Sequence, residues 1–170
     1  HTTPVSIASS RTLSGAITVT AGSLKLAETG TLASTIAMSG GVLDADESST
    51  VSGALSHTAD ITIDVADNKT LTYSGTAISL GANTLTLSGG GSLVSGGLTL
   101  NDASSKLLLN SITVDNVSTT SDSLGLDVNA DSTVTSLLVA NITPVSIASG
   151  SSLSGGITVS VGSLKLNETG

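Results

Sequence analysis

The chain has 170 residues, of which 38% are hydrophobic and 11% charged, and its net charge at pH 7 is −8. This composition excludes a disordered chain, because disorder requires low hydrophobicity and high charge. No apolar run approaches the roughly 18 residues of a membrane-spanning helix. The five basic residues are scattered singly, which excludes the clustered basic surface of a nucleic-acid-binding protein.

Small residues dominate the sequence. Serine and threonine are by far the commonest polar residues, Cys, Phe and Trp are absent, and Tyr73 is the one tyrosine. A wide globular core would use aromatic rings, since each ring buries a large area. The sequence therefore predicts a thin core filled by Leu, Ile, Val and Ala, without disulfide bonds.

In chain order, one apolar residue followed by two alternating apolar pairs recurs along the sequence. The first circuit contains Leu13, Ile17, Val19, Leu24 and Leu26. The next four contain Leu32, Ile36, Met38, Leu43 and Ala45; Val51, Leu55, His57, Ile61 and Ile63; Leu71, Ile78, Leu80, Leu85 and Leu87; and Leu93, Leu98, Leu100, Leu107 and Leu109. The sixth contains Val114, Val117, Leu124 and Leu126, and the seventh Val134, Leu138, Ala140, Val145 and Ile147.

The last pair of each circuit opens at a nearly regular spacing, at Leu24, Leu43, Ile61, Leu85, Leu107, Leu124, Val145 and Leu164. The mean spacing of about 20 residues is within the range of known repeat architectures. Alternation of apolar and polar residues is typical of strands. Three short strands per circuit, separated by Gly, Ser, Asn and Asp corners, predict an all-β fold: a parallel β-helix, or β-solenoid, of roughly triangular cross-section. A β-sandwich is the structural alternative, but it does not explain a constant circuit length.

A longer repeat encloses this cycle. Residues 143–170 match residues 3–30 at 21 of 28 positions. We interpret residues 3–142 as one superperiod of about seven circuits and residues 143–170 as the start of the next copy, within one continuous solenoid over residues 1–170. Neither end shows a recognisable cap, and an open solenoid end is an unpaired β-edge. We expect neighbouring repeats, or identical subunits stacked end to end, to cover these edges.

The segments GSLKL (22–26 and 162–166) and ETGTL (28–32) resemble repeats of bacterial autotransporter passenger domains and filamentous-haemagglutinin-type adhesins. The resemblance implies a right-handed parallel β-helix at the cell surface or outside the cell, acting as a stalk, adhesin or filament.

Acidic positions provide one candidate site. The predicted register places Asp46 and Asp64 after the last apolar pair in adjacent circuits, and Asp127 in the same place one circuit after Asn110. Two carboxylates one strand spacing apart can chelate Ca²⁺, although a solvated acidic stripe is the alternative. The register also stacks Lys25 on Asp44 as a cross-strand ion pair.

Other motifs give no catalytic or cofactor-binding site. Polysaccharide cleavage needs two carboxylates in a cleft, and although Asp60, Asp64 and Asp67 are near one another, aromatic residues that would stack on sugars are missing. His57 occupies an apolar position, which predicts a partly buried variant of the core pattern. Residues 88–91 (SGGG) predict a corner with positive φ. Glycosylation sequons begin at Asn68, Asn116, Asn141 and Asn167.

The leading functional hypothesis is a non-enzymatic structural repeat of a long extracellular or cell-surface fibrous protein, forming a rod or filament. The second is an adhesin that binds glycans or surfaces through its outer faces, and the third is a polysaccharide-degrading enzyme.

Overall fold

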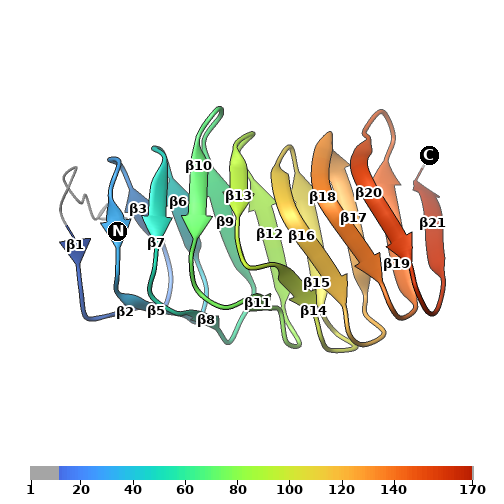
Figure 1. Cartoon of the computed structure of the whole chain (residues 1–170), viewed down its shortest axis with the longest axis horizontal. Coiled ribbons are helices and arrows are strands. Elements are labelled where there is room, and N and C mark those ends of the chain that lie inside the picture. Colours follow the sequence, from blue (N-terminus) through green and yellow to red (C-terminus); the bar gives the residue numbers. More distant parts are fainter. Residues whose placement is uncertain (1–11, 170) are drawn as a thin grey trace.

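The structure, a computed structural model, describes residues 12–169 and the side chains of residues 12–163. This part of the chain is all β and winds about seven times around one axis, in coils of about 20 residues. Successive coils lie side by side from one end to the other, so the molecule is elongated (Figure 1). The strand pairs in the described residues are parallel. The predicted β-solenoid is confirmed.

One face of the solenoid is an eight-stranded sheet, which we call face C, with one strand in each coil. Its buried side chains alternate with outward-facing ones, as in any sheet that covers a core on one side. A buried row runs along it through Leu24, Leu43, Ile63, Leu87, Leu109 and Val128. The strands are β3 (Ser23–Leu26), β6 (Val42–Ala45), β9 (Ile61–Val65), β12 (Thr84–Ser88), β15 (Lys106–Asn110), β17 (Gly125–Ala130), β19 (Thr143–Ala148) and β21 (Leu164–Thr169).

The other two faces are separate in the early coils and merge in the later ones. Face A begins with β1 (Thr12–Leu13), β4 (Thr31–Leu32), β7 (Ser49–Val51), β10 (Thr70–Tyr73) and β13 (Ser92–Val94). Face B begins with β2 (Ala16–Val19), β5 (Thr35–Met38) and β8 (Leu55–His57), and β11 (Ile78–Ser79) and β14 (Leu98–Leu100) follow in the next two coils.

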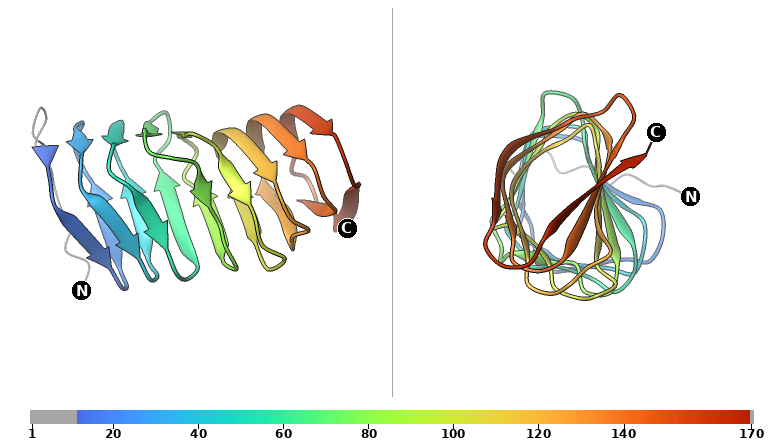
Figure 2. Two further views of the ribbon diagram at one scale, coloured as in Figure 1. Left: turned by 60° about the horizontal axis from the view of Figure 1, so that its bottom comes forward. Right: turned by 90° about the vertical axis from the view of Figure 1, so that its right-hand side faces the viewer.

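The merger occurs at β16 (Thr113–Thr119), which pairs with both β13 and β14. The following strands β18 (Ser132–Val139) and β20 (Leu153–Val159) are similarly long and pair with each other along both halves. The last coils therefore contain two strands where the first contain three. All coils nevertheless enclose one common interior, as the end-on view in Figure 2 shows.

Serine hydroxyls at the corners explain part of the unusual composition. Ser34 donates to the carbonyl oxygen of Leu13 at 3.1 Å, and Ser49 donates to that of Glu28 at 3.0 Å. Both serines are buried. Each hydroxyl therefore satisfies a backbone acceptor of the preceding coil and is itself buried with a partner.

Face B is interrupted between the third and fourth coils, because β8 pairs with β5 but not with β11. The coil that joins β9 to β12 is also the longest of those aligned on face C. Asp64 and its partner Ser88 are 24 residues apart in the sequence. Two side chains bridge the interruption. In the first bridge, the Tyr73 hydroxyl accepts the Leu55 N–H at 3.1 Å.

The second bridge is His57, whose Nε2 lies 3.1 Å from the carbonyl oxygen of Ser79 in β11. Its Nδ1 lies 3.2 Å from the carbonyl oxygen of Ala59. His57 is half-buried opposite the buried Met38, which confirms the predicted variant of the core pattern. Beside Tyr73, Gly75 leaves room for the phenol, because a Cβ atom there would overlap the ring.

Two core assignments from the sequence are wrong. Leu124, predicted to face the interior, is 58% exposed and precedes β17. In the seventh coil the predicted inward pair was Leu138 and Ala140, but Leu137 and Val139 are the buried residues. A one-residue slip exchanges the two faces of a strand. Leu137 pairs with the buried Val117, and this pairing turns Leu137 and Val139 toward the interior.

The glycine corner at 88–91 is confirmed. Gly89 and Gly90 have φ angles of +106° and +79°, which L side chains rarely adopt. A Cβ atom on Gly89 would also overlap the carbonyl oxygen of Val65 in the preceding coil. Separately, no helix in residues 12–169 is long and apolar enough to cross a membrane.

Candidate functional surfaces

Ion pairs between neighbouring coils form the first candidate surface, on face C. Lys25 in β3 stands opposite Asp44 in β6, as predicted, with Nζ 3.4 Å from an Asp44 carboxylate oxygen. The same Nζ lies closer to Asp46, at 2.7 Å. The lysine thus binds two carboxylates of the next coil, and the second contact was not predicted.

The predicted register of Asp46 and Asp64 is wrong. Asp44, not Asp46, stands opposite Asp64. The cause lies in β9, where Ile61, Ile63 and Val65 all face inward, so that Leu43 aligns with the second of them. Asp64 in turn accepts a hydrogen bond from the hydroxyl of Ser88 on the following coil.

Asp127 is also displaced from its predicted place. Asn110 pairs with Ala130, whereas Asp127 pairs with Leu108. Among the described side chains, those of residues 12–163, no group of three or more His, Cys, Asp or Glu is arranged to hold a metal ion. Calcium binding stays a prediction, and melting with and without a chelator tests it.

Burial and neighbouring charge act in opposite directions on this cluster. Partial burial raises the pKa of Asp44 above its ordinary value, outweighing the attraction of Lys25, and the nearby Asp46 and Asp64 charges add to the rise. The hydrogen bond to Asp46 raises the pKa of Lys25. Asp46 is therefore the stronger partner of the lysine, whereas burial disfavours the charged form of Asp44.

Two further lysines make the same kind of contact. Lys69 Nζ lies 2.6 Å from Glu47, and Lys106 Nζ lies 2.7 Å from Asp127. Every lysine whose side chain the structure describes thus binds a carboxylate of a neighbouring coil. Since the lysine side chains are about a third exposed, solvent screens these pairs and each adds little to stability. Their main effect is on the alignment of coils.

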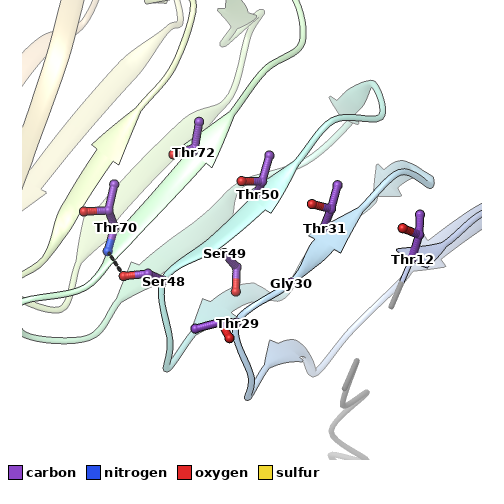
Figure 3. Close-up of a pocket in the computed structure, with 9 residues that line it drawn as sticks. All are labelled: Thr12, Thr29, Gly30, Thr31, Ser48, Ser49, Thr50, Thr70 and Thr72. Carbon is purple, nitrogen blue, oxygen red and sulfur yellow. Dashed lines mark hydrogen bonds between the residues drawn. The ribbon is translucent and has the colours of Figure 1, made fainter. Parts of the chain in front are cut away.

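A row of hydroxyls forms the second candidate surface, on the outside of face A. Thr12, Thr31, Thr50 and Thr72 stand in register on four successive coils. They line a shallow groove of about 540 Å³ together with Thr29, Gly30, Ser48, Ser49 and Thr70 (Figure 3). Within it the Ser48 hydroxyl accepts the Thr70 N–H at 3.1 Å. The lining is uncharged and non-aromatic, and it presents hydroxyl and methyl groups at the spacing of the strands.

Two of the three carboxylates considered for polysaccharide cleavage, Asp60 and Asp64, have structural contacts. Asp60 accepts the Thr84 N–H of the next coil at 2.7 Å, and Asp64 accepts the Ser88 hydroxyl. Asp67 lies in the turn after β9, next to the sequon residue Asn68. A second groove of about 610 Å³ runs over face C and includes Asp60 and Lys106 among its lining residues.

The sequons differ in accessibility. Asn68 is exposed in a turn, with a φ angle of +60°, and Asn116 is exposed within β16. Asn141 is half-buried, and the hydroxyl of its sequon partner Thr143 is fully buried. The Asn167 side chain lies outside the described side chains. Asn68 and Asn116 are therefore more accessible than Asn141.

The fold defines this chain as a β-solenoid of tandem coils. A comparison with protein-family models, curated proteins and solved structures found no match to the chain. Its function therefore has to be argued from the repeat and from the surfaces described above.

Proposed function

We propose that this chain is a non-enzymatic structural repeat of a long extracellular or cell-surface fibrous protein, in which successive repeats continue one solenoid as a rod or filament. The observation that carries the proposal is the return of the first coil at residues 153–169 in sequence and at two glycine corners, although β20 there is one strand where the first coil has β1 and β2. Gly15 and Gly155 both have φ +122°, and Gly22 and Gly162 have φ +83° and +90°. A chain that returns to the same coil can continue indefinitely.

The contacts between coils support this role. Backbone hydrogen bonds run along the axis, and buried aliphatic rows continue from coil to coil without a boundary that would define a separate domain. Repeat proteins of this type gain stability from each neighbour interface. A longer array is accordingly expected to be stiffer and more stable than a single repeat.

Tandem chains with two, three and four copies of residues 3–142 test the proposal. Seven strand spacings per copy predict a length increase of about 34 Å per added copy. Small-angle scattering and electron microscopy measure this length. A matched chain with a flexible Gly-Ser linker between copies is the control and should bend at each junction. If the uninterrupted chains bend as freely as the control, the rod is refuted.

Adhesion through the threonine-lined groove is the second candidate, because four hydroxyls in register can bind a polar polymer such as a glycan. The double variant Thr31→Val/Thr50→Val is expected to lose surface or glycan binding, whereas Thr86→Val on face C keeps it. Equal binding by both variants would remove the groove from consideration.

A further inference from the structure

His57 has a carbonyl oxygen opposite each of its two ring nitrogens. The residue lies at the end of β8, at the interruption of face B, and it is half-buried. Nδ1 lies 3.2 Å from the carbonyl oxygen of Ala59, in the turn that follows β8. Nε2 lies 3.1 Å from the carbonyl oxygen of Ser79, in β11 of the next coil. The ring therefore spans the junction between the third and fourth coils.

The number of protons on the ring decides whether both contacts are hydrogen bonds. A carbonyl oxygen accepts and does not donate, so each ring nitrogen has to donate. A neutral imidazole has one N–H and one bare nitrogen, whereas the protonated ring has two N–H groups. The neutral ring thus places a nitrogen lone pair against the carbonyl oxygen of Ala59 or Ser79. The protonated ring satisfies both oxygens, and its bonds are stronger because the donor is charged.

The contact with Ser79 is important because face B has no strand ladder at this junction. In residues 12–169, β8 pairs with β5 and β11 pairs with β14, but β8 and β11 do not pair with each other. Tyr73 provides the other bridge, in which its hydroxyl accepts the Leu55 N–H. That bond forms without the gain of a proton. Of the two bridges, the one made by His57 is therefore the one that protonation strengthens.

The groups packed around His57 do not oppose a positive charge on the ring. The neighbouring strands β5 and β11 contain no titratable residue. Asp60 follows in the same turn, and its carboxylate accepts the Thr84 N–H of the next coil. Tyr73 is the titratable residue that β10 brings to this junction. The net charge of the chain is −8 at pH 7, which favours a cation at its surface.

We propose that His57 is a proton-operated clasp between the third and fourth coils. Protonation of the ring closes the contacts with Ala59 and Ser79 together, and loss of the proton opens one of them. Histidine is the side chain whose charge ordinarily changes between about pH 5 and pH 8, so acidification within this range closes the clasp. Because the folded chain holds the proton through bonds that the unfolded chain lacks, the stability from the clasp is present in acid and falls as the pH rises.

This inference goes beyond the proposed function and does not depend on it, because the junction lies within one chain. His57 is the only histidine in residues 3–142. In an array of such repeats, each superperiod would contain one junction that tightens in acid. The other junctions contain no histidine and would not respond through this side chain.

Denaturant unfolding of the parent chain and of His57→Gln, between about pH 5 and pH 8, tests the clasp. Glutamine keeps an N–H donor at this position but does not titrate. We expect the equilibrium constant for unfolding of the parent to rise about fivefold relative to that of His57→Gln across this range, which corresponds to the loss of about one hydrogen bond. Carboxylates such as that of Asp44 are present in both chains and cancel in the comparison.

Asp60→Asn is the matched control, because it removes the acidic group of the same turn and leaves the ring in place. Its unfolding should keep the pH dependence of the parent. Nitrogen-15 NMR of the parent chain is an independent measurement, since protonated and bare ring nitrogens have different chemical shifts. We expect both nitrogens of His57 to carry hydrogen-bonded protons at the acid end of the range and one to be bare at the alkaline end. The spectrum of His57→Gln separates these signals from those of His1, the other histidine.

Three results would overturn the clasp. If the parent and His57→Gln give parallel curves of stability against pH, protonation does not strengthen the junction. If Asp60→Asn abolishes the pH dependence, the response belongs to that carboxylate. If the NMR spectrum in acid shows a hydrogen bond at one ring nitrogen alone, the ring does not hold both carbonyl oxygens. None of these results changes the expected lengths of the tandem chains, so the clasp and the proposed function can fail separately.

Discussion

Tyr73 is the residue whose removal tests the interruption of face B most directly. Its side chain is 4% exposed, and its hydroxyl accepts the Leu55 N–H at 3.1 Å where no neighbouring strand does so. Tyr73→Phe keeps the ring and removes the acceptor. Leaving a fully buried N–H without a partner costs about 1–3 kcal/mol. Leu55 is half-buried, so we expect the free energy of unfolding to fall by about 1 kcal/mol, the lower end of that range.

Denaturant unfolding followed by circular dichroism measures this change at constant temperature. In thermal unfolding, each 1 kcal/mol corresponds to a decrease in Tm of roughly 2–4 °C for a chain of this size. Thr72→Val is the matched control, since this residue lies on the same strand but faces outward, and surface changes usually stay within about 0.5 kcal/mol. If Tyr73→Phe is as stable as the control, the hydroxyl does not support the interruption.

Three further predictions concern the core, a corner and the acidic cluster. Leu87→Ala in the buried row of face C should lower the free energy of unfolding by about 2–5 kcal/mol, measured by denaturant titration; a loss below about 1 kcal/mol would contradict close packing there. Gly89→Ala should destabilise the chain, because its φ is +106° and the added Cβ overlaps a carbonyl oxygen; an unchanged Tm would count against this corner geometry. The pKa of Asp44 is raised above 3.8 in the folded state, so the folded protein binds more protons than the unfolded one between 3.8 and the raised value, and stability falls as pH rises through that window. Asp44→Asn should remove this contribution, and parallel pH–stability curves for parent and variant would show the assignment to be wrong.

The sequence predicts the architecture well because the solenoid repeats one local rule. Alternating aliphatics separated by small polar corners recur in every coil, and each coil aligns with the next through the same side chains. The pairs Leu24–Leu43 and Leu85–Leu107 follow directly from this rule. The Lys25–Asp44 contact follows too, because both residues lie between inward-facing neighbours in adjacent strands.

The register cannot be predicted wherever a strand offers more inward positions than its partner. In β9 three inward residues can align with a two-residue pair in two ways, and apolar periodicity does not distinguish them. In the run Leu137–Leu138–Val139, the sequence alone likewise does not show which residues face inward. The alignment is set there by neighbouring strands, through contacts that a single coil does not contain.

Single exceptional residues were equally hard to predict. Tyr73 and His57 break the aliphatic pattern, and nothing in the sequence connects them. They meet at the same interruption of face B, because β8 and β11 do not pair there and each residue contacts the backbone of the neighbouring coil. The contact of Lys25 with Asp46 likewise depends on how far a long side chain reaches beyond its own register.

The interruption between β8 and β11 has a mechanical consequence. Hydrogen bonds in a solenoid lie along its long axis, so a tensile force on the rod loads the coil junctions in series. A series fails at its weakest member. In residues 12–169, the junction where β8 and β11 do not pair is held on face B by single contacts from Tyr73 and His57 rather than by a strand ladder. A pulled array would therefore fracture once in every superperiod, at this same plane, and extend in equal steps.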